Sequence, residues 1–343
     1  MNRTLRTQRT RIALVVGGVL ALVVSGLANG GDGAAEAAGT MGSSTPIRTV
    51  KSLANGQTVK TFRYHTQSPD EIGDVYYNRT WVGTSTKRAA VIVVHGGWWH
   101  NADRAAGTRA AQKWLDSGFV VFNIDYRVAA DHAAFAGSGR EGTAVPGARW
   151  PAQRTDVALA YDWFKANAAQ FNVDPRRVAL YGFSAGGHLV NSASGYYGTA
   201  RFRASASVSG IQQPKRTAEI VMNPAGGASS PMLVKSFGYM TSAIGCSYEP
   251  TWSTCGAKWR DFQPESYFGA TKPAIYAAKG TVDPVEPIAA LQATDTLLTR
   301  AGQRHLVVSV TGRGHDENIV LGTGADDVTR WKQLLAWMRS VTA

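Results

Sequence analysis

The 343-residue sequence has only two cysteines, Cys246 and Cys255, and neither belongs to a C-x-x-C pair. No histidine lies near them in the sequence, which argues against a tetrahedral zinc site. No internal repeat occurs, and no dense Lys/Arg run follows the first 11 residues although the formal net charge is +12. The basic balance therefore indicates solvated surface charge, and we expect no nucleic-acid partner. A hydrophobic content of 44% excludes disorder throughout the chain.

Long apolar runs are also scarce, and the one exception lies near the start of the chain. Arginines at 3, 6, 9 and 11 precede "IALVVGGVLALVVSGLA" (12–28), and "AEA" follows at 35–37. This order predicts a secretory signal peptide over residues 1–37, with an uncleaved membrane anchor as the alternative. No cysteine lies at the end of the apolar run, so a lipid anchor is not expected. The arginines before the run are not adjacent, so a twin-arginine signal is not expected either. We expect a secreted protein with no stable membrane association after cleavage.

The rest of the chain predicts one domain with an insertion. Residues 38–60 are expected to form a linker and N-terminal extension, and residues 61–343 a single domain. Residues 211–272, rich in Pro, Gly, Ser and aromatics, separate two predicted strands. A structureless loop of that length is uncommon, so a cap is predicted there, closed by a Cys246–Cys255 disulfide. A second long, Gly-rich loop is expected at 137–150.

Short apolar runs alternate with amphipathic stretches from residue 46 onward. Near-continuous apolar runs predict buried strands at 89–96, 119–126, 177–182, 204–210, 274–280 and 305–312. Helical patterns lie at 104–118, 153–171, 184–197, 288–302 and 326–341. The alternation predicts an α/β fold with a mostly parallel central sheet flanked by helices. Functional loops are expected at the carboxyl ends of its strands.

The stretch "GFSAGG" places Ser184 between glycines, after a predicted strand and before a predicted helix. Gly182-Phe183-Ser184-Ala185-Gly186 matches G-x-S-x-G, in which the glycines permit a sharp strand-to-helix turn that exposes the serine oxygen. The alternative is a small residue in a tight turn. We predict that Ser184 is a nucleophile.

A serine hydroxyl needs a base, and the base needs a carboxylate to fix its tautomer. His305 opens a predicted strand and so lies at the wrong end of the sheet, whereas His315 follows that strand. Asp283 follows the strand at 274–280 and is the preferred acid, with Glu286 as the alternative. The order Ser184, Asp283, His315 is the one expected for this turn.

Acyl transfer also needs donors aimed at the developing oxyanion. "HGGWW" (95–99) follows the strand at 89–96. The backbone N–H groups of Gly97 and Ala185 are the predicted oxyanion hole, with Trp98 or Gly96 as a further donor. Gly96 and Trp99 are also expected to contact substrate.

Together "HGGWW", "NIDYR" (123–127), "WPAQRTDVALAYDWF", "GFSAGG", Asp283 and His315 resemble the α/β-hydrolase superfamily. Within it the chain looks like the esterase/lipase branch related to hormone-sensitive lipases and feruloyl esterases. The resemblance covers about residues 85–340. It implies an α/β-hydrolase fold and cleavage of small-molecule or polymer-borne carboxylic esters through an acyl-serine, with no metal or organic cofactor.

One departure from that branch keeps alternatives open: Trp98 stands where the H-G-G-G form has its third glycine. Arylformamidases of the same superfamily often show H-G-G followed by aromatic residues, so amide hydrolysis is the main alternative. A serine peptidase and a non-catalytic binding protein on this fold are the others. The tryptophans, including Trp252 and Trp259, are candidates for a groove wall, while His188, just inside the predicted helix, is expected to be a packing or helix-orienting residue. The oligomeric state is not predicted.

Overall fold

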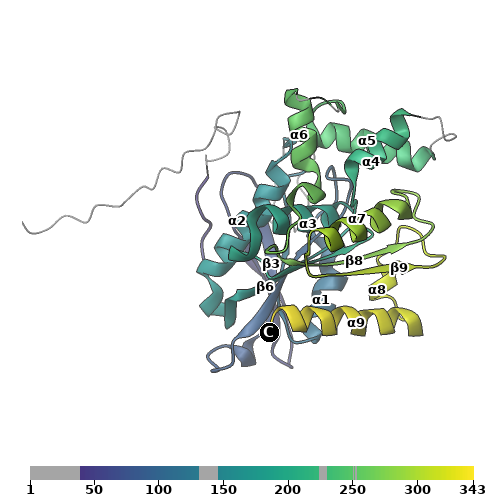
Figure 1. The fold of residues 1–343 in the computed structure, drawn as a ribbon. Coiled ribbons are helices and arrows are strands. Elements are labelled where there is room, and N and C mark those ends of the chain that lie inside the picture. Colours follow the sequence, from purple (N-terminus) through teal and green to yellow (C-terminus); the bar gives the residue numbers. More distant parts are fainter. Residues whose placement is uncertain (1–38, 131–145, 224–229, 250, 252) are drawn as a thin grey trace, which may run out of the picture. The chain divides into compact units, whose positions relative to one another are not determined.

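The computed structural model describes residues 39–130, 146–223, 230–249, 251 and 253–343. The predicted signal peptide, most of the predicted loop at 137–150 and Trp252 lie outside these residues. Within them, one nine-stranded sheet has the order β1-β2-β3-β5-β4-β6-β7-β8-β9 (Figure 1). Its strands are β1 Arg48–Ser52, β2 Gln57–Arg63, β3 Ile72–Asn78, β4 Arg88–Val94, β5 Val120–Ile124, β6 Val173–Phe183, β7 Ala204–Val208, β8 Ala274–Gly280 and β9 His305–Val310.

The helices connect these strands in chain order. They are η1 Arg79–Trp81, η2 Arg104–Gly107, α1 Thr108–Asp116, α2 Ala152–Ala166, η3 Ala168–Phe171, α3 Ala185–Tyr197, η4 Gly198–Ala200, α4 Pro214–Met222, α5 Pro231–Ile244, α6 Thr254–Phe262, η6 Pro264–Tyr267, α7 Ile288–Arg300, α8 Asn318–Leu321 and α9 Ala325–Val341. Strands β5, β4, β6, β7, β8 and β9 are mutually parallel. The predicted α/β fold with a mostly parallel sheet is confirmed.

Helices cover both faces of the parallel strands because successive strand residues point to opposite faces. In β4, Ile92 and Val94 belong to the cluster that packs under α2 and α3. Their neighbours Val91 and Val93 join the cluster beneath α1 and α9. Because neither face of these strands meets water, their sequences are nearly continuous apolar runs.

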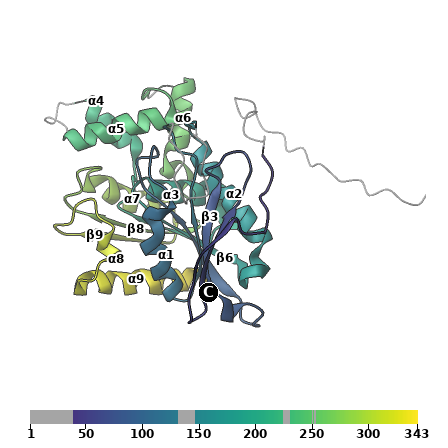
Figure 2. The ribbon, with the colours of Figure 1, turned by 180° about the vertical axis from the view of Figure 1, so that it is seen from behind.

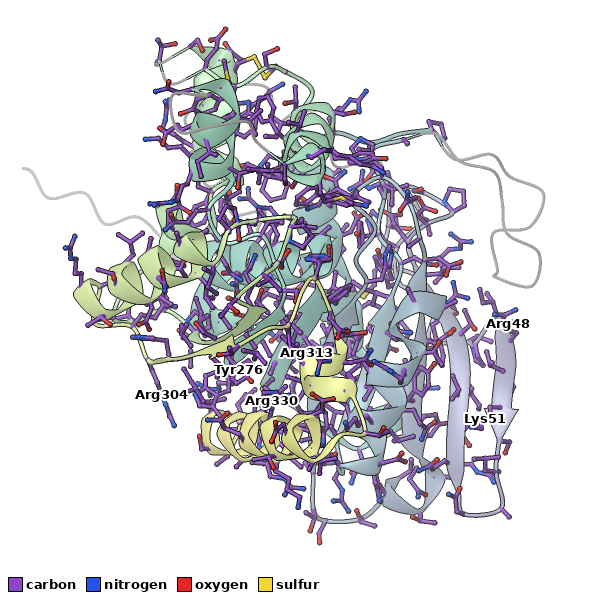
Figure 3. The ribbon with its side chains drawn as sticks, turned by 90° about the vertical axis from the view of Figure 1, so that its right-hand side faces the viewer. Arg48, Lys51, Tyr276, Arg304, Arg313 and Arg330 are labelled. Atoms are coloured by element: carbon purple, nitrogen blue, oxygen red, sulfur yellow. A yellow bond between two sulfur atoms is a disulfide. The ribbon has the colours of Figure 1, made fainter. Side chains whose placement is uncertain are left out.

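The N-terminal strands differ from the prediction. Residues 38–60, predicted to be a linker and N-terminal extension, contain β1 and the start of β2, which pair antiparallel in the sheet. The sheet therefore includes strands from this extension, and residue 61 lies inside β2. Arg48 and Lys51 lie on β1 (Figure 3), and such charged side chains discourage edge-to-edge pairing of sheets.

The segment from 211 to 272, between β7 and β8, contains α4, α5, α6 and η6. The views from front and back both show α4, α5 and α6 gathered at one end of the sheet (Figures 1 and 2). The disulfide Cys246–Cys255 is present, with the Cα atoms 5.9 Å apart, and links the end of α5 to the start of α6. None of the helices formed by the described residues is long and apolar enough to cross a bilayer.

Candidate active site

Ser184 occupies the turn between β6 and α3. Its backbone has φ +56° and ψ −124°, a conformation that non-glycine residues rarely adopt. The flanking glycines are required by space: a Cβ on Gly182 would lie 2.3 Å from the Gly186 carbonyl oxygen, and one on Gly186 would lie 2.1 Å from the Val94 carbonyl oxygen. The G-x-S-x-G pattern thus lets the turn pass close to β4 while the serine side chain points away.

The structure brings Ser184, His315 and Asp283 together. His315 Nε2 lies 2.8 Å from Ser184 Oγ, and His315 Nδ1 lies 3.0 and 3.2 Å from the two oxygens of Asp283. A carboxylate accepts only, so Nδ1–H donates to Asp283 and Nε2 is left to accept from the serine hydroxyl. The exposed fractions of Ser184 and Asp283 are both 6%, so the proton path is largely shielded from water.

The loop that carries His315 follows β9 and is held on several sides. Arg313, labelled in Figure 3, donates to Asp327 of α9 at 3.0 Å and pairs with Asp316 at 2.5 Å. Ser209 donates through its hydroxyl to the carbonyl of Asp316. These contacts fix the loop from α9 and from the end of β7, so the imidazole has one defined position.

Asp283 is an ionised carboxylate in a buried setting. Burial raises its pKa, but the hydrogen bond from His315 and the nearby Lys279 ammonium lower it by more, so the pKa lies below its usual 3.8. Lys279 Nζ lies 3.6 Å from Asp283 Oδ2, and the Val285 N–H donates to Oδ1 at 2.8 Å. The acid can therefore hold the imidazole and stabilise its protonated form.

The other acid and base considered in the sequence lie elsewhere. Glu286 faces Lys279 and the backbone N–H groups of Gln212 and Gln213. His305 lies at the start of β9 and pairs with Asp295. The geometry therefore favours Asp283 and His315 over these two residues.

The "HGGWW" segment forms a tight loop against Ser184. A Cβ on Gly96 would lie 3.1 Å from Ser184 Cβ, and one on Gly97 would lie 2.1 Å from the Asn101 carbonyl oxygen. Gly97 and Trp98 have positive φ angles of +101° and +60°, so the backbone bends sharply at these two residues. Ala185 is the first residue of α3, where helix N–H groups lack intrahelical acceptors. The loop thus holds Gly96 directly against the serine.

The prediction that Trp99 contacts substrate is wrong. Its side chain is only 1% exposed, packs on His188 and Phe262, and donates from Nε1 to His188 Nδ1 at 3.2 Å. His188 therefore donates from Nε2 to the Phe262 carbonyl at 2.8 Å, and burial lowers its pKa to about 3. Both residues therefore form the packed floor under the turn.

Trp98 is the half-buried tryptophan of this loop, and it contacts the segment 211–272. Its ring stacks on Tyr239 of α5, with centroids 5.2 Å apart and planes 25° apart. Trp259 of α6, in contrast, is buried and packs on Phe237 and Tyr248 within the same segment. The candidate oxyanion loop and α5 therefore share an aromatic contact.

Segment 211–272 is also fixed to the main domain by a buried charge. Arg154 of α2 donates to both carboxylate oxygens of Asp261 in α6, at 3.0 Å each. Trp150 Nε1 donates to the same carboxylate at 2.7 Å, and Tyr267 adds a hydroxyl donor. Asp261 thus joins α6 to α2 and to Trp150, which lies just before α2.

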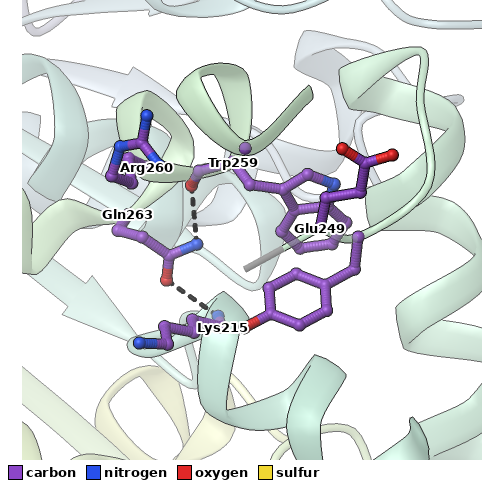
Figure 4. Close-up of a pocket in the computed structure, with 7 residues that line it drawn as sticks. Lys215, Glu249, Trp259, Arg260 and Gln263 are labelled. Carbon is purple, nitrogen blue, oxygen red and sulfur yellow. Dashed lines mark hydrogen bonds between the residues drawn. The ribbon is translucent and has the colours of Figure 1, made fainter. Parts of the chain in front are cut away.

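A small cavity of about 140 Å³ lies within segment 211–272 (Figure 4). It is lined by Lys215, Tyr248, Glu249, Gly256, Trp259, Arg260 and Gln263. Gln263 bridges its wall by accepting from the Lys215 N–H and donating to the Trp259 carbonyl. No triad residue lines this cavity. Over the described ranges, no three Asp, Glu, His or Cys side chains gather as metal ligands.

Three residues that shape the site had not been identified from the sequence: Lys279, Tyr239 and Arg154. Lys279 carries a usable signal, because a lysine inside the apolar strand "AIYAAKG" must find a buried carboxylate. Tyr239 and Arg154 carry none, since their partners Trp98 and Asp261 lie far away in the sequence.

Comparisons with known proteins show which family the chain belongs to. The sequence model of the BD-FAE family matches residues 74–296. Esterase LipC of Mycobacterium tuberculosis is 37% identical over 106 residues, which cover 30% of this chain and 22% of that protein. Secreted lipase 5 of Gibberella zeae is 32% identical over 112 residues, covering 32% and 20%. The chain thus spans about a fifth of the length of these curated relatives.

Solved structures share the fold at low identity. A truncated carbohydrate esterase from gut microbiota superposes with a TM-score of 0.57 at 22% identity, covering 80% of this chain and 91% of that one. Esterase B from Lactobacillus rhamnosis gives a TM-score of 0.64 at 16% identity, covering 85% and 88%. Since the family model matches well over half of the sequence, the chain has the α/β-hydrolase fold and belongs to the BD-FAE family of esterase-type α/β hydrolases.

Proposed function

We propose that the protein is a carboxylesterase that cleaves carboxylic esters through an acyl intermediate on Ser184. The observation that carries the proposal is the unbroken chain from Ser184 Oγ to His315 at 2.8 Å and on to Asp283 at 3.0 Å. Nucleophile, base and orienting acid in hydrogen-bond reach are what serine acyl transfer needs. The strained turn at Ser184 and the family membership support the same conclusion.

In the proposed acylation, Ser184 Oγ attacks the ester carbonyl carbon and its proton passes to His315 Nε2. The imidazolium is stabilised by Asp283 across the Nδ1–H bond. When the tetrahedral intermediate collapses, the C–O bond to the alcohol breaks and Nε2 gives its proton to the leaving oxygen. Water then attacks the acyl-serine with His315 again as base, which releases the acid and restores Ser184.

The proposed oxyanion hole consists of the N–H groups of Gly97 and Ala185, with Trp98 N–H as a further donor. Gly96 lies against Ser184, so its backbone is proposed to border the substrate. A single donor of this kind is worth about 3 kcal/mol of transition-state stabilisation. The donors are backbone groups of the closely packed loop and of the first residue of α3, and therefore need no rearrangement when charge develops.

We further propose that the protein is secreted and that residues 211–272 form a cap over the site. The disulfide Cys246–Cys255 supports an oxidising compartment, and one relative is named a secreted lipase. The Trp98–Tyr239 stack supports the cap, because it joins α5 to the loop beside Ser184. A small-molecule or polymer-borne ester is the proposed substrate class, with no metal or organic cofactor required.

Amide hydrolysis is a second candidate because of Trp98. In place of a third glycine, its half-buried ring and Tyr239 add an aromatic wall beside the candidate oxyanion loop. Such a wall suits a flat aryl group, which both aryl esters and aryl formamides carry.

The test is hydrolysis of p-nitrophenyl esters from acetyl to long-chain acyl, together with a feruloyl ester and an aryl formamide. Ser184→Ala should abolish turnover, whereas Ser192→Ala on the same helix should leave kcat/KM within about twofold, since Ser192 Oγ is buried without a hydrogen-bond partner in the described chain. Serine-dependent cleavage of esters supports the proposal. Cleavage of the formamide alone would replace it by the second candidate, and turnover that survives in Ser184→Ala would overturn both.

A further inference from the structure

The catalytic acid Asp283 belongs to a buried trio of charged side chains, together with Lys279 and Glu286. Lys279 Nζ lies 2.7 Å from Glu286 Oε2 and 3.6 Å from Asp283 Oδ2, and all three side chains are fully buried. Asp283 Oδ2 is also the oxygen closest to His315 Nδ1, at 3.0 Å. The imidazole of His315 and the ammonium of Lys279 therefore share one carboxylate oxygen.

Glu286 ties this trio to the start of segment 211–272. Its two oxygens accept from the Gln212 N–H at 2.9 Å each, and one also accepts from the Gln213 N–H at 2.8 Å. Gln213 is the N-cap residue of α4. A continuous path therefore runs from the first turn of that segment through Glu286, Lys279 and Asp283 to His315.

The charges of the trio do not balance while His315 is neutral. One ammonium and two carboxylates leave an excess negative charge in a region that excludes water, where unpaired charge is costly. A proton on His315 Nε2 makes the imidazolium the fourth member and brings the total to zero. The buried set is thus arranged for the charge state that exists during proton transfer from Ser184.

We propose that Lys279 and Glu286 are positioning residues for the Ser184 reaction: Lys279 holds Asp283 Oδ2 in place, and Glu286 offsets the lysine charge so that Asp283 keeps its full attraction for protonated His315. This inference rests on the proposed function. It also gives Glu286 a role other than the triad acid considered from the sequence.

Other charged groups near the trio and His315 must be separated from this effect. Glu265 of η6 is electrostatically coupled to Glu286: burial first, and then the charge of Glu286, raise the pKa of Glu265 to about 7. Lys215 acts on Glu265 from α4. On the loop of His315 itself, Asp316 is paired with Arg313, and burial raises the pKa of Glu317 to about 6. Glu265→Gln and Glu317→Gln are therefore included as controls.

The experiment measures the acid limb of kcat/KM against pH, and in parallel the pH titration of the His315 ring by NMR, assigned with His315→Ala. Glu286→Gln removes a negative charge, so the midpoint of both curves should move to lower pH by about 0.5 to 1 unit, and kcat should fall about threefold to tenfold. Lys279→Met removes the positive charge, so the midpoints should move to higher pH. The double variant restores the wild-type charge total and should return both midpoints toward wild type.

Opposite shifts that cancel in the double variant support the proposal, because a purely structural role would lower activity without moving the midpoints in opposite directions. Midpoints that stay fixed, or that move the same way in both single variants, overturn it. Lys279→Gln replaces Lys279→Met if the latter does not fold. The NMR titration needs no substrate, so absence of ester turnover in the wild type would refute the proposed function and still leave this inference tested.

Discussion

Replacing Asp283 by Asn is the most informative single perturbation of the site. The two Asp283 oxygens accept from two donors, Val285 N–H at 2.8 Å on Oδ1 and His315 Nδ1 at 3.0 Å on Oδ2, and Oδ2 also lies 3.6 Å from the Lys279 ammonium. An amide must place its NH2 group at one of these positions, where it faces a donor. Keeping the Val285 bond places NH2 toward His315 Nδ1, which selects the tautomer whose Nε2 cannot accept the Ser184 proton.

The loss combines this wrong tautomer with removal of the charge that stabilises the imidazolium. Loss of the carboxylate charge in a Ser-His-Asp arrangement lowers kcat by about 10³- to 10⁴-fold, equivalent to roughly 4 to 5.5 kcal/mol of activation free energy. We expect Asp283→Asn to fall in that range when kcat is measured on a short-chain p-nitrophenyl ester, with the circular dichroism spectrum unchanged.

Glu286→Gln is the matched control, since it makes the same chemical change in a buried carboxylate three residues away. It should cost tenfold at most, because Glu286 contacts Lys279 and two backbone N–H groups instead of His315. A larger loss in Glu286→Gln than in Asp283→Asn would make Glu286 the acid. A loss below tenfold in Asp283→Asn would refute the reasoning about the tautomer.

Three further predictions concern packing, buried charge and pH. Gly186→Ala should lower the stability by several kcal/mol in denaturant melts, because its Cβ would lie 2.1 Å from the Val94 oxygen, while Gly238→Ala in α5, with open space around it, should be neutral or slightly stabilising. An unstable Gly238→Ala would contradict this. Arg127→Met should cost about 3 to 5 kcal/mol by leaving buried Asp156 without its bidentate partner, whereas Arg176→Met, at a pair whose arginine side chain is 80% exposed, should leave the stability nearly unchanged; equal costs would count against the argument. Because the pKa of Asp283 lies below its usual 3.8, the ionised acid adds stability above that pH, which is lost as the pH falls through 3.8 and below. The stability of Asp283→Asn should therefore depend less on pH between about 2 and 4, and an unchanged slope would refute this point.

Much of the parallel sheet could be predicted because its strands are buried on both faces. Each of the runs at 89–96, 119–126, 177–182, 204–210, 274–280 and 305–312 contains or overlaps one strand of the structure. The antiparallel strands were missed for the opposite reason. β2 and β3 carry polar residues in buried positions, and the pairing of Thr61 with Asp74 between the two strands hides the apolar pattern that the prediction depends on.

The site was predictable to the extent that each residue has a fixed place at a strand end. Ser184 follows β6, Asp283 follows β8 and His315 follows β9, and parallel strands bring these ends to one edge. The side-chain directions could not be predicted, as Trp98 and Trp99 demonstrate. They are adjacent and chemically identical, yet one stacks on Tyr239 and the other is buried on His188, because only the folded loop sets which ring turns inward.

The most direct test of the central claim is to locate a covalent adduct on the nucleophile. Diethyl p-nitrophenyl phosphate should phosphorylate the wild-type protein once, with loss of p-nitrophenol, and tryptic digestion should place the added mass on Ser184 in the peptide 178–201. That peptide also contains Ser192 and Ser194, which serve as internal controls once it is fragmented. The account predicts an adduct on Ser184 and none in Ser184→Ala; an adduct on another serine, or ester turnover with no adduct at all, would contradict it.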